Sequence, residues 1–269
     1  MDARVVRISI APLKSLGLVH PEEVQLGAGG VVGNRRFWLR DESGRLFNGK
    51  RSGALQQIRP QWDEDTRRLA LTFPDGAVVD GVVELGDEVS AEMYGYLVPS
   101  RRVHGPWEDA ISEHVGRPLE LLWADDNAVD RTPDGGTVSV VSRASLERLR
   151  EEAGAADAID GRRFRMLFEI DGVAAHEEDA WIGGEVRIGD ATIGFNGDIG
   201  RCIVTSRHPD TGVPDVPTLV TLASYRREGK TEPLPFGVYG SVRAPGRVRV
   251  GDIAKPLSLS QWQPEAVPS

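Results

Sequence analysis

Residues 69–83 read LALTFPDGAVVDGVV and set two short apolar segments on either side of the pair Asp75-Gly76. The pair is typical of a tight hairpin turn, because glycine readily adopts the positive backbone φ angles that such turns require. The apolar segments therefore predict strands at 69–72 and 77–83, joined as an antiparallel hairpin. This stretch indicates a chain that folds mainly through β-strands.

Short apolar segments of the same kind recur along the chain. We expect strands at 5–10, 22–26, 37–39, 138–141, 167–170, 185–188, 202–205, 238–242 and 247–250. Helical spacing predicts helices at 107–115, 145–152 and 218–226, and Ser142 is a candidate cap for the second. Strands outnumber helices and do not alternate with them regularly. This pattern predicts a mainly β fold with a few helices (α+β), built from mixed or antiparallel sheets that form barrels.

The length of the chain and the order of the expected strands and helices bear on the domain organisation. A chain of 269 residues can hold one large domain or two small ones. We place a boundary near 103–108, which gives a β-barrel-like first domain at 1–105 and a second domain at 106–262. Residues 263–269 end a Pro-rich stretch and are expected to form a loose tail.

The charge balance bears on the partners of the chain. Lys plus Arg number 32 and Asp plus Glu number 41, so the net charge is −9. An acidic chain is repelled by phosphate backbones and by anionic lipid, so we expect neither a nucleic acid nor a membrane surface as partner. The first 15 residues carry four charges and no long apolar run, and a cytoplasmic location is therefore expected.

Several familiar motifs are excluded by their spacing. In residues 27–33, GAGGVVG, the third glycine falls one place late for a dinucleotide loop, and a strand-like segment follows where a helix is needed. The five histidines are scattered without the spacing of a zinc site. Residues 176–179, HEED, predict a solvated acidic loop.

Cys202 is the only cysteine, which excludes an internal disulfide, a Cys-rich zinc site and a cysteine-ligated iron–sulfur cluster. A single cysteine at a strand start is commonly a small buried hydrophobe. Here Arg201 precedes it, and an adjacent guanidinium favours the thiolate, which is the form that ligates soft metals. Basic residues at Lys14 (beside Ser15), Arg36 and Arg165 would hold a phosphate if the fold brought them to one cleft.

These segments together resemble the MOSC family, named for the molybdenum cofactor sulfurase C-terminal domain, in its two-part form with an N-terminal MOSC β-barrel domain. Within the family the chain is similar to the mitochondrial amidoxime-reducing components and to bacterial reductases of N-hydroxylated compounds. The resemblance rests most on Arg201-Cys202-Ile203-Val204-Thr205 with the turn Pro209-Asp210-Thr211-Gly212. It also includes Pro12-Leu13-Lys14-Ser15, Arg36-Phe37-Trp38-Leu39, Arg163-Phe164-Arg165 and Phe236-Gly237-Val238-Tyr239. It makes 1–105 the N-terminal MOSC β-barrel domain and 106–262 the MOSC domain.

The resemblance also implies a cofactor and its site. It implies a molybdenum cofactor of the molybdopterin type, with Cys202 as catalytic residue and thiolate ligand of the metal; pyridoxal phosphate is not expected. The pterin and its phosphate would be bound by Lys14, Ser15, Arg36, Arg165 and Arg201, with Tyr239 near the cofactor. The chain departs from the family pattern where Met166-Leu167 replaces Pro-Asn and where His208 replaces an Asp.

The implied function is the reduction of hydroxylamines, amidoximes and N-hydroxylated bases to amines. A single cysteine cannot hold an iron–sulfur cluster, so electrons are expected from a separate flavin, ferredoxin or cytochrome-type protein. An alternative is a non-redox sulfur carrier or cofactor-binding module that uses a Cys202 persulfide. A third alternative is a MOSC-like scaffold whose cysteine is inert core.

Overall fold

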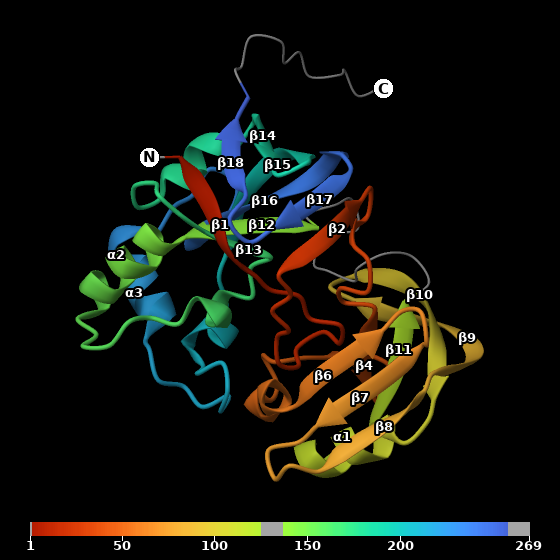
Figure 1. Cartoon of the computed structure of the whole chain (residues 1–269). Helices are drawn as coiled ribbons and strands as arrows, with labels where there is room; N and C mark the ends of the chain where they lie inside the picture. The colour runs from red at the N-terminus through yellow and green to blue at the C-terminus, as the bar shows by residue number, and fades with distance from the viewer. Residues whose placement is uncertain (1, 125–136, 258–269) are drawn as a thin grey trace.

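The computed structural model describes residues 2–124 and 137–257, which form two β units side by side (Figure 1). One unit is a closed barrel in which neighbouring strands follow the order β1-β13-β12-β16-β15-β14-β18. Among the described barrel strands, β12 and β13 run parallel to each other, and the other neighbouring pairs are antiparallel. The strands are β1 (Ala3–Ile8), β12 (Val138–Ser142), β13 (Phe168–Asp171), β14 (Glu185–Ile188), β15 (Ala191–Gly200), β16 (Pro235–Ala244) and β18 (Ile253–Pro256).

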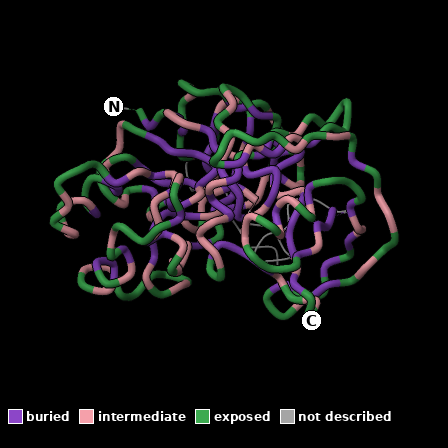
Figure 2. The backbone as a smooth tube through the Cα atoms, turned by 90° about the horizontal axis from the view of Figure 1, so that it is seen from below, coloured by how far each residue is buried: buried purple, intermediate pink, exposed green. Residues whose placement is uncertain are grey.

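Alternation along the barrel strands produces its core. Val138 and Val140 of β12, and Phe168 and Ile170 of β13, are fully buried in one apolar cluster with residues of the other barrel strands. Alternate residues of a strand point to the same face, so a single strand fills the barrel with every second side chain. Buried residues accordingly lie at the centre of the molecule, and exposed residues lie at its periphery (Figure 2).

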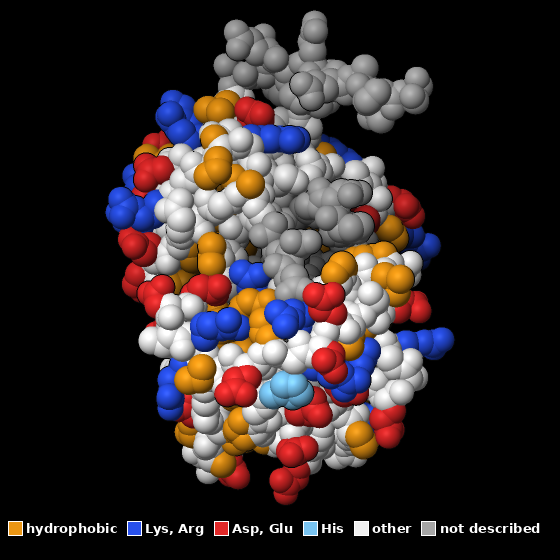
Figure 3. All heavy atoms as spheres, turned by 90° about the vertical axis from the view of Figure 1, so that its right-hand side faces the viewer, with side chains coloured by type: hydrophobic (Ala, Val, Ile, Leu, Met, Phe, Trp, Pro, Cys, Tyr) orange, Lys and Arg blue, Asp and Glu red, His pale blue; other side chains and the backbone are white. Residues whose placement is uncertain are grey.

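The other unit contains a five-stranded sheet of order β5-β4-β11-β10-β9 and a three-stranded sheet of order β6-β7-β8. Phe37, Leu69 and Trp107 join them in one apolar core that includes α1. The elements are β4 (Phe37–Asp41), β5 (Leu46–Phe47), β6 (Arg59–Asp63), β7 (Arg68–Thr72), β8 (Val78–Val82), β9 (Glu84–Met93), β10 (Tyr96–His104), α1 (Trp107–Val115) and β11 (Leu119–Ala124). Basic and acidic side chains interleave over the lower part of the face shown in Figure 3.

A small third sheet, two α-helices and four short 3-10 helices complete the described part of the fold. A third sheet of order β17-β2-β3 joins β17 (Gly246–Arg249), β2 (Glu23–Gly27) and β3 (Gly30–Val31). The remaining elements are α2 (Arg143–Ala153), α3 (Thr218–Tyr225), η1 (Gly53–Gln57), η2 (Gly161–Phe164), η3 (Glu177–Trp181) and η4 (Ile203–Ser206). Within the described residues, none of the helices is long and apolar enough to cross a membrane.

The predicted mainly β α+β fold with a mixed barrel is confirmed. The hairpin at 69–83 forms as β7 and β8, and the first predicted helix has the bounds of α1. Ser142 caps α2, because its hydroxyl accepts a hydrogen bond from the Ser145 amide.

The predicted division at residue 105 stays a prediction. β1 lies in the barrel between β13 and β18, whereas β11 pairs with β4 and β10 of the other unit. Each unit therefore contains strands from both sides of residue 105. The predicted tail at 263–269 lies outside the described residues.

Two local predictions are wrong. Residues 202–205 do not form a strand: the carbonyl of Cys202 accepts hydrogen bonds from the amide of Thr205, at 3.0 Å, and from its hydroxyl, at 2.9 Å, which closes the segment into η4. Glu178, predicted in a solvated acidic loop, is fully buried. Its carboxylate accepts from the Ser142 amide at 3.1 Å and from the Ser145 hydroxyl at 2.7 Å, and these bonds offset part of the cost of burial.

Candidate functional site

A cavity of about 210 Å³ lies between the barrel and the other unit and receives side chains from both. The barrel unit contributes residues that include Ser139, Arg163, Arg165, Met166, Arg201, Cys202 and Tyr239. The other side is formed by Lys14, Ser15, Arg35, Asn48, Lys50 and Tyr94. Six of the seven residues predicted for the site therefore share one cavity; Arg36 does not line it.

The loop after β1 displays Lys14 and Ser15 between two anchors. Leu13 and Leu16 are fully buried, and they fix the loop to the apolar core of the unit that lies beside the barrel, the core of Phe37, Leu69 and Trp107. The Lys14 amide donates to the Phe37 carbonyl at 2.8 Å, and Ser15 has a positive φ of 80°. The apolar anchors and this tight turn leave the two polar side chains facing the cavity.

Arg36, which was predicted to bind the cofactor, does not line the cavity, whereas its neighbour Arg35 does. Arg35 has a φ of 53°, and its amide donates to the Ala11 carbonyl at 2.7 Å. Arg36 instead lies over the Trp123 ring, with 4.7 Å between its guanidinium carbon and the ring centroid. The left-handed residue turns the chain just before β4 begins, so the two arginine side chains leave in different directions.

Arg165 enters the cavity from the turn after η2. It also has a positive φ, 55°, and its amide donates to the Arg162 carbonyl at 3.0 Å. One of its guanidinium nitrogens, Nη2, is buried and has no hydrogen-bond partner among the described residues. Arg163, which also lines the cavity, is used differently: it donates to both carboxylate oxygens of Asp215, at 2.9 and 3.1 Å.

The cavity brings together positively charged side chains that are partly buried. Burial lowers the pKa of Lys14 well below its usual value, and repulsion from Arg35, Arg165 and Lys50 lowers it further. Burial likewise lowers the pKa of Arg35 to about 10 and, together with repulsion from Arg35, that of Arg165 to about 9. A lowered pKa of a basic group means that its charged form is disfavoured when no ligand is bound. An anion placed among these groups would reverse the effect.

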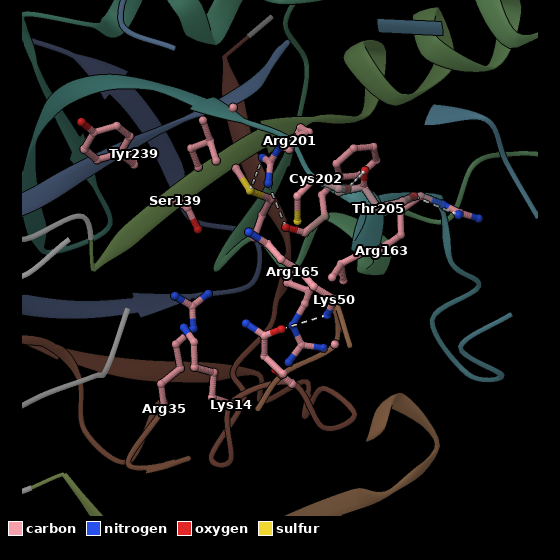
Figure 4. Close-up of a pocket in the computed structure, with 18 of the residues that line it drawn as sticks. Lys14, Arg35, Lys50, Ser139, Arg163, Arg165, Arg201, Cys202, Thr205 and Tyr239 are labelled. Atoms are coloured by element: carbon pink, nitrogen blue, oxygen red, sulfur yellow. Dashed lines mark hydrogen bonds between the residues drawn. The ribbon is translucent and has the colours of Figure 1, made fainter. Parts of the chain in front are cut away.

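Cys202 lies where β15 has ended and η4 begins, and its side chain is partly exposed. In Figure 4 its sulfur points into the space toward which Lys14 and Arg35 extend from the other unit. Arg201 lines the same cavity, and its side chain donates to the carbonyls of Phe236, at 2.8 Å from Nε, and of Phe164, at 3.2 Å. Arg201 therefore ties the cysteine loop to the barrel wall.

Met166 and Tyr239 form part of the barrel side of the cavity. Met166 is buried, and its sulfur accepts a hydrogen bond from Arg201 Nη2 at 2.9 Å, so a thioether stands at the position of the proline in the family pattern. Tyr239 of β16 pairs with Ser139 of β12, and both residues line the cavity.

Sequence reasoning missed Arg35, Asn48, Lys50 and Tyr94. The pair Asn48-Gly49 is typical of a turn and could have indicated that Lys50 is displayed from one. Tyr94 gave no such signal, because its place depends on how the hairpin of β9 and β10 is folded against the rest of the unit.

The fold and the site define a class of protein: two β units that enclose a cationic cavity containing a single thiol. A family model described as the MOSC N-terminal beta barrel domain matches residues 2–115, and one described as the MOSC domain matches residues 128–255. The chain belongs to the MOSC family, as the resemblance predicted.

Curated relatives match along most of their length. The mitochondrial amidoxime reducing component 2 of Bos taurus is 37% identical over 279 residues, which cover 92% of this chain and 81% of that protein. The protein of the same name from Homo sapiens is 37% identical over 280 residues, covering 92% and 82%. The mitochondrial amidoxime-reducing component 1 of Mus musculus is 27% identical over 281 residues, covering 92% and 80%.

Proposed function

We propose that the chain binds a molybdenum cofactor in this cavity and reduces N-hydroxylated compounds, such as hydroxylamines, amidoximes and N-hydroxylated bases, to amines. The observation that carries the proposal is that the sulfur of Cys202 shares one cavity with a cluster of cations, of which Lys14, Arg35 and Arg165 are partly buried. Similarity to relatives named amidoxime-reducing components supports the class of substrate.

The residues fit the anionic part of such a cofactor. Lys14, Arg35 and Arg165 are cations whose charged forms are disfavoured by burial, and Nη2 of Arg165 lacks an acceptor among the described residues. A phosphate group supplies about two negative charges and three strong acceptor oxygens, so it would offset the repulsion among these cations and give Nη2 of Arg165 an acceptor. We assign them, with the Ser15 hydroxyl, to the pterin phosphate.

The metal end fits Cys202. A thiolate is a preferred ligand of soft metals, and this one faces the cavity. Within the described residues, no three His, Cys, Asp or Glu side chains gather in a way that could hold a metal ion. In the proposal the protein therefore gives one ligand, and the sulfurs of the pterin give others.

When bound, the cofactor supplies the two-electron reduction that breaks the N–O bond, with two protons taken up and the oxygen leaving as water. The protein orients the cofactor and keeps it among fixed positive charges. Arg201 positions Cys202 through the carbonyls of Phe236 and Phe164. A separate electron-transfer protein would deliver the electrons.

The test is a metal and activity analysis of protein made in a host that synthesises the pterin. We expect close to one molybdenum per chain and reduction of a soluble amidoxime with a reduced viologen dye as electron donor. Cys202→Ser should lose both while unfolding at an unchanged temperature. Val220→Ala, at a residue that is 74% exposed, is the control and should keep both.

Full turnover by the Cys202→Ser variant would refute the role of the thiolate. Metal-free protein whose mass is raised by one sulfur atom at Cys202 would instead support a persulfide carrier.

A further inference from the structure

Tyr94 occupies a backbone position that rarely suits an aromatic residue. It forms a two-residue turn with Gly95 between β9 and β10, closed by the pair Met93 and Tyr96, and both turn residues have positive φ, 51° and 92°. Turns of this kind favour Asn, Asp or Gly, because bulky side chains are strained at positive φ. Strain of this kind is commonly found where a side chain has a function.

The tyrosine ring contacts two of the cavity lysines. The ammonium nitrogen of Lys14 lies 5.8 Å from the ring centroid, and that of Lys50 lies 5.4 Å from it. The amide of Asn48 donates to the tyrosine hydroxyl at 3.2 Å, while its carbonyl oxygen accepts from the Lys50 amide at 3.0 Å. Asn48 is buried, so it fixes the hydroxyl of the hairpin tip to the loop that carries Lys50.

An aromatic ring suits this place better than a carboxylate would. The face of the ring attracts an ammonium group through its quadrupole, which opposes the repulsion among Lys14, Lys50 and the neighbouring arginines. A carboxylate would do the same but would also neutralise the cations that an anionic ligand needs. Glu232 is the only acid among the described residues that line the cavity, and its carboxylate accepts from the Gly200 amide at 3.1 Å.

We propose that Tyr94 is a positioning residue of the anion site: its ring holds the ammonium groups of Lys14 and Lys50 in place for a phosphate-bearing ligand. The hairpin of β9 and β10 thereby completes a site whose other wall is the barrel. The inference rests on the proposed function in taking the ligand to be the cofactor phosphate. Its test uses inorganic phosphate on cofactor-free protein, so that either proposal can fail without the other.

The test compares Tyr94→Asn and Tyr94→Phe with the unchanged chain, made in a host that lacks the pterin, by titration with inorganic phosphate. Asn suits positive φ, so Tyr94→Asn should unfold at the same or a higher temperature and yet bind phosphate about tenfold more weakly, since two cation–π contacts of this size are lost. Tyr94→Phe keeps the ring and should bind within about threefold of the unchanged chain. Leu97→Asn, on the same hairpin at a residue that is 68% exposed, should bind normally.

A pH series separates positioning from a general structural role. The ring favours the charged form of Lys14, so in Tyr94→Asn phosphate binding should weaken at a lower pH than in the unchanged chain. Equal affinity and an equal pH profile for Tyr94→Asn and the unchanged chain would overturn the proposal. So would equal losses in the Asn and Phe variants, or no phosphate binding by the unchanged chain.

Discussion

Gly53 and Gly212 touch across the junction of the two units, with no room for a side chain on either. A Cβ atom on Gly212 would lie 2.0 Å from the Gly53 carbonyl oxygen, and one on Gly53 would lie 2.1 Å from that of Gly212. Gly212 ends the turn Pro209-Asp210-Thr211-Gly212 that follows the cysteine loop. Asp210 of this turn accepts from Arg59 at 3.1 Å, and the Thr211 carbonyl accepts from Gln57 at 2.8 Å. The turn docks the barrel onto η1 and so fixes one edge of the cavity.

Gly212→Ala should destabilise the protein by about 3 kcal/mol or more, since it adds a steric clash to an unfavourable φ of 69°. Gly44→Ala is the matched control: Gly44 has a φ of 75° but nothing within 4 Å of an added Cβ, so its substitution should cost only about 1 kcal/mol. Thermal unfolding measures both. Similar melting temperatures for the two variants would mean that the backbone at Gly53 and Gly212 can move apart at little cost in free energy.

Arg35→Gln should weaken phosphate binding, and retention of molybdenum, about 10- to 100-fold, the effect of losing one charge-assisted hydrogen bond of about 1.5–3 kcal/mol. Arg36→Gln removes the same charge one residue later, outside the cavity, and should leave both unchanged. It should slightly lower the melting temperature through the lost contact with Trp123. Titration with phosphate and metal analysis measure the contrast, and an equal loss in both variants would mean that only net charge matters.

His176 predicts a pH dependence of stability. Burial, followed by repulsion from Arg226 and Arg148, lowers the pKa of His176 to about 4. The unfolded chain, with a histidine pKa near 6.5, binds the proton first, so stability should fall as the pH drops from about 6.5 to 4 and then level off. The full shift corresponds to about 3.4 kcal/mol, and because the ring is partly exposed to water we expect a loss of about 2 kcal/mol. The raised pKa of buried Glu178 gives the opposite slope above its own usual value.

The measurement is denaturant unfolding from pH 7 to 4 in the unchanged chain and in His176→Asn, because Asn tolerates the positive φ of 62° at this position. The variant should lose most of the slope that the histidine gives, while His104→Asn in the other unit should keep it. A slope unchanged in His176→Asn would place its source in another group.

The parts of the fold that the sequence predicted well have strong local signals. Asp75-Gly76 determines its hairpin, Ser142 caps α2, and Gly116 ends α1 with a left-handed φ of 77°. The strand predicted at 202–205 was wrong because β-branched residues there fitted a strand, whereas a side-chain bond from Thr205 to the Cys202 carbonyl closed a turn. Competition of this kind between side chain and backbone is not visible in periodicity.

The site was predictable in kind but not in detail. Lys14, Arg165 and Cys202 lie far apart in the sequence, and the fold brings them to one cavity. The choice between Arg35 and Arg36 depends on a left-handed backbone residue, which no pattern of charge reveals. The burial of Glu178 similarly depends on Ser142 and Ser145, hydroxyl and amide donors that lie 33 to 36 residues earlier in the chain.

The pairing of β1 with β18 has a consequence for biosynthesis. Ala3 of β1 pairs with Ala254 of β18. Among the described residues, β1 is therefore synthesised almost first and its barrel neighbour β18 almost last. Non-local contacts of this kind form slowly. Strands that wait for their partners expose unpaired backbone, which favours aggregation of incomplete chains. The need for chaperones during synthesis should therefore increase with the time between the synthesis of β1 and the synthesis of β18.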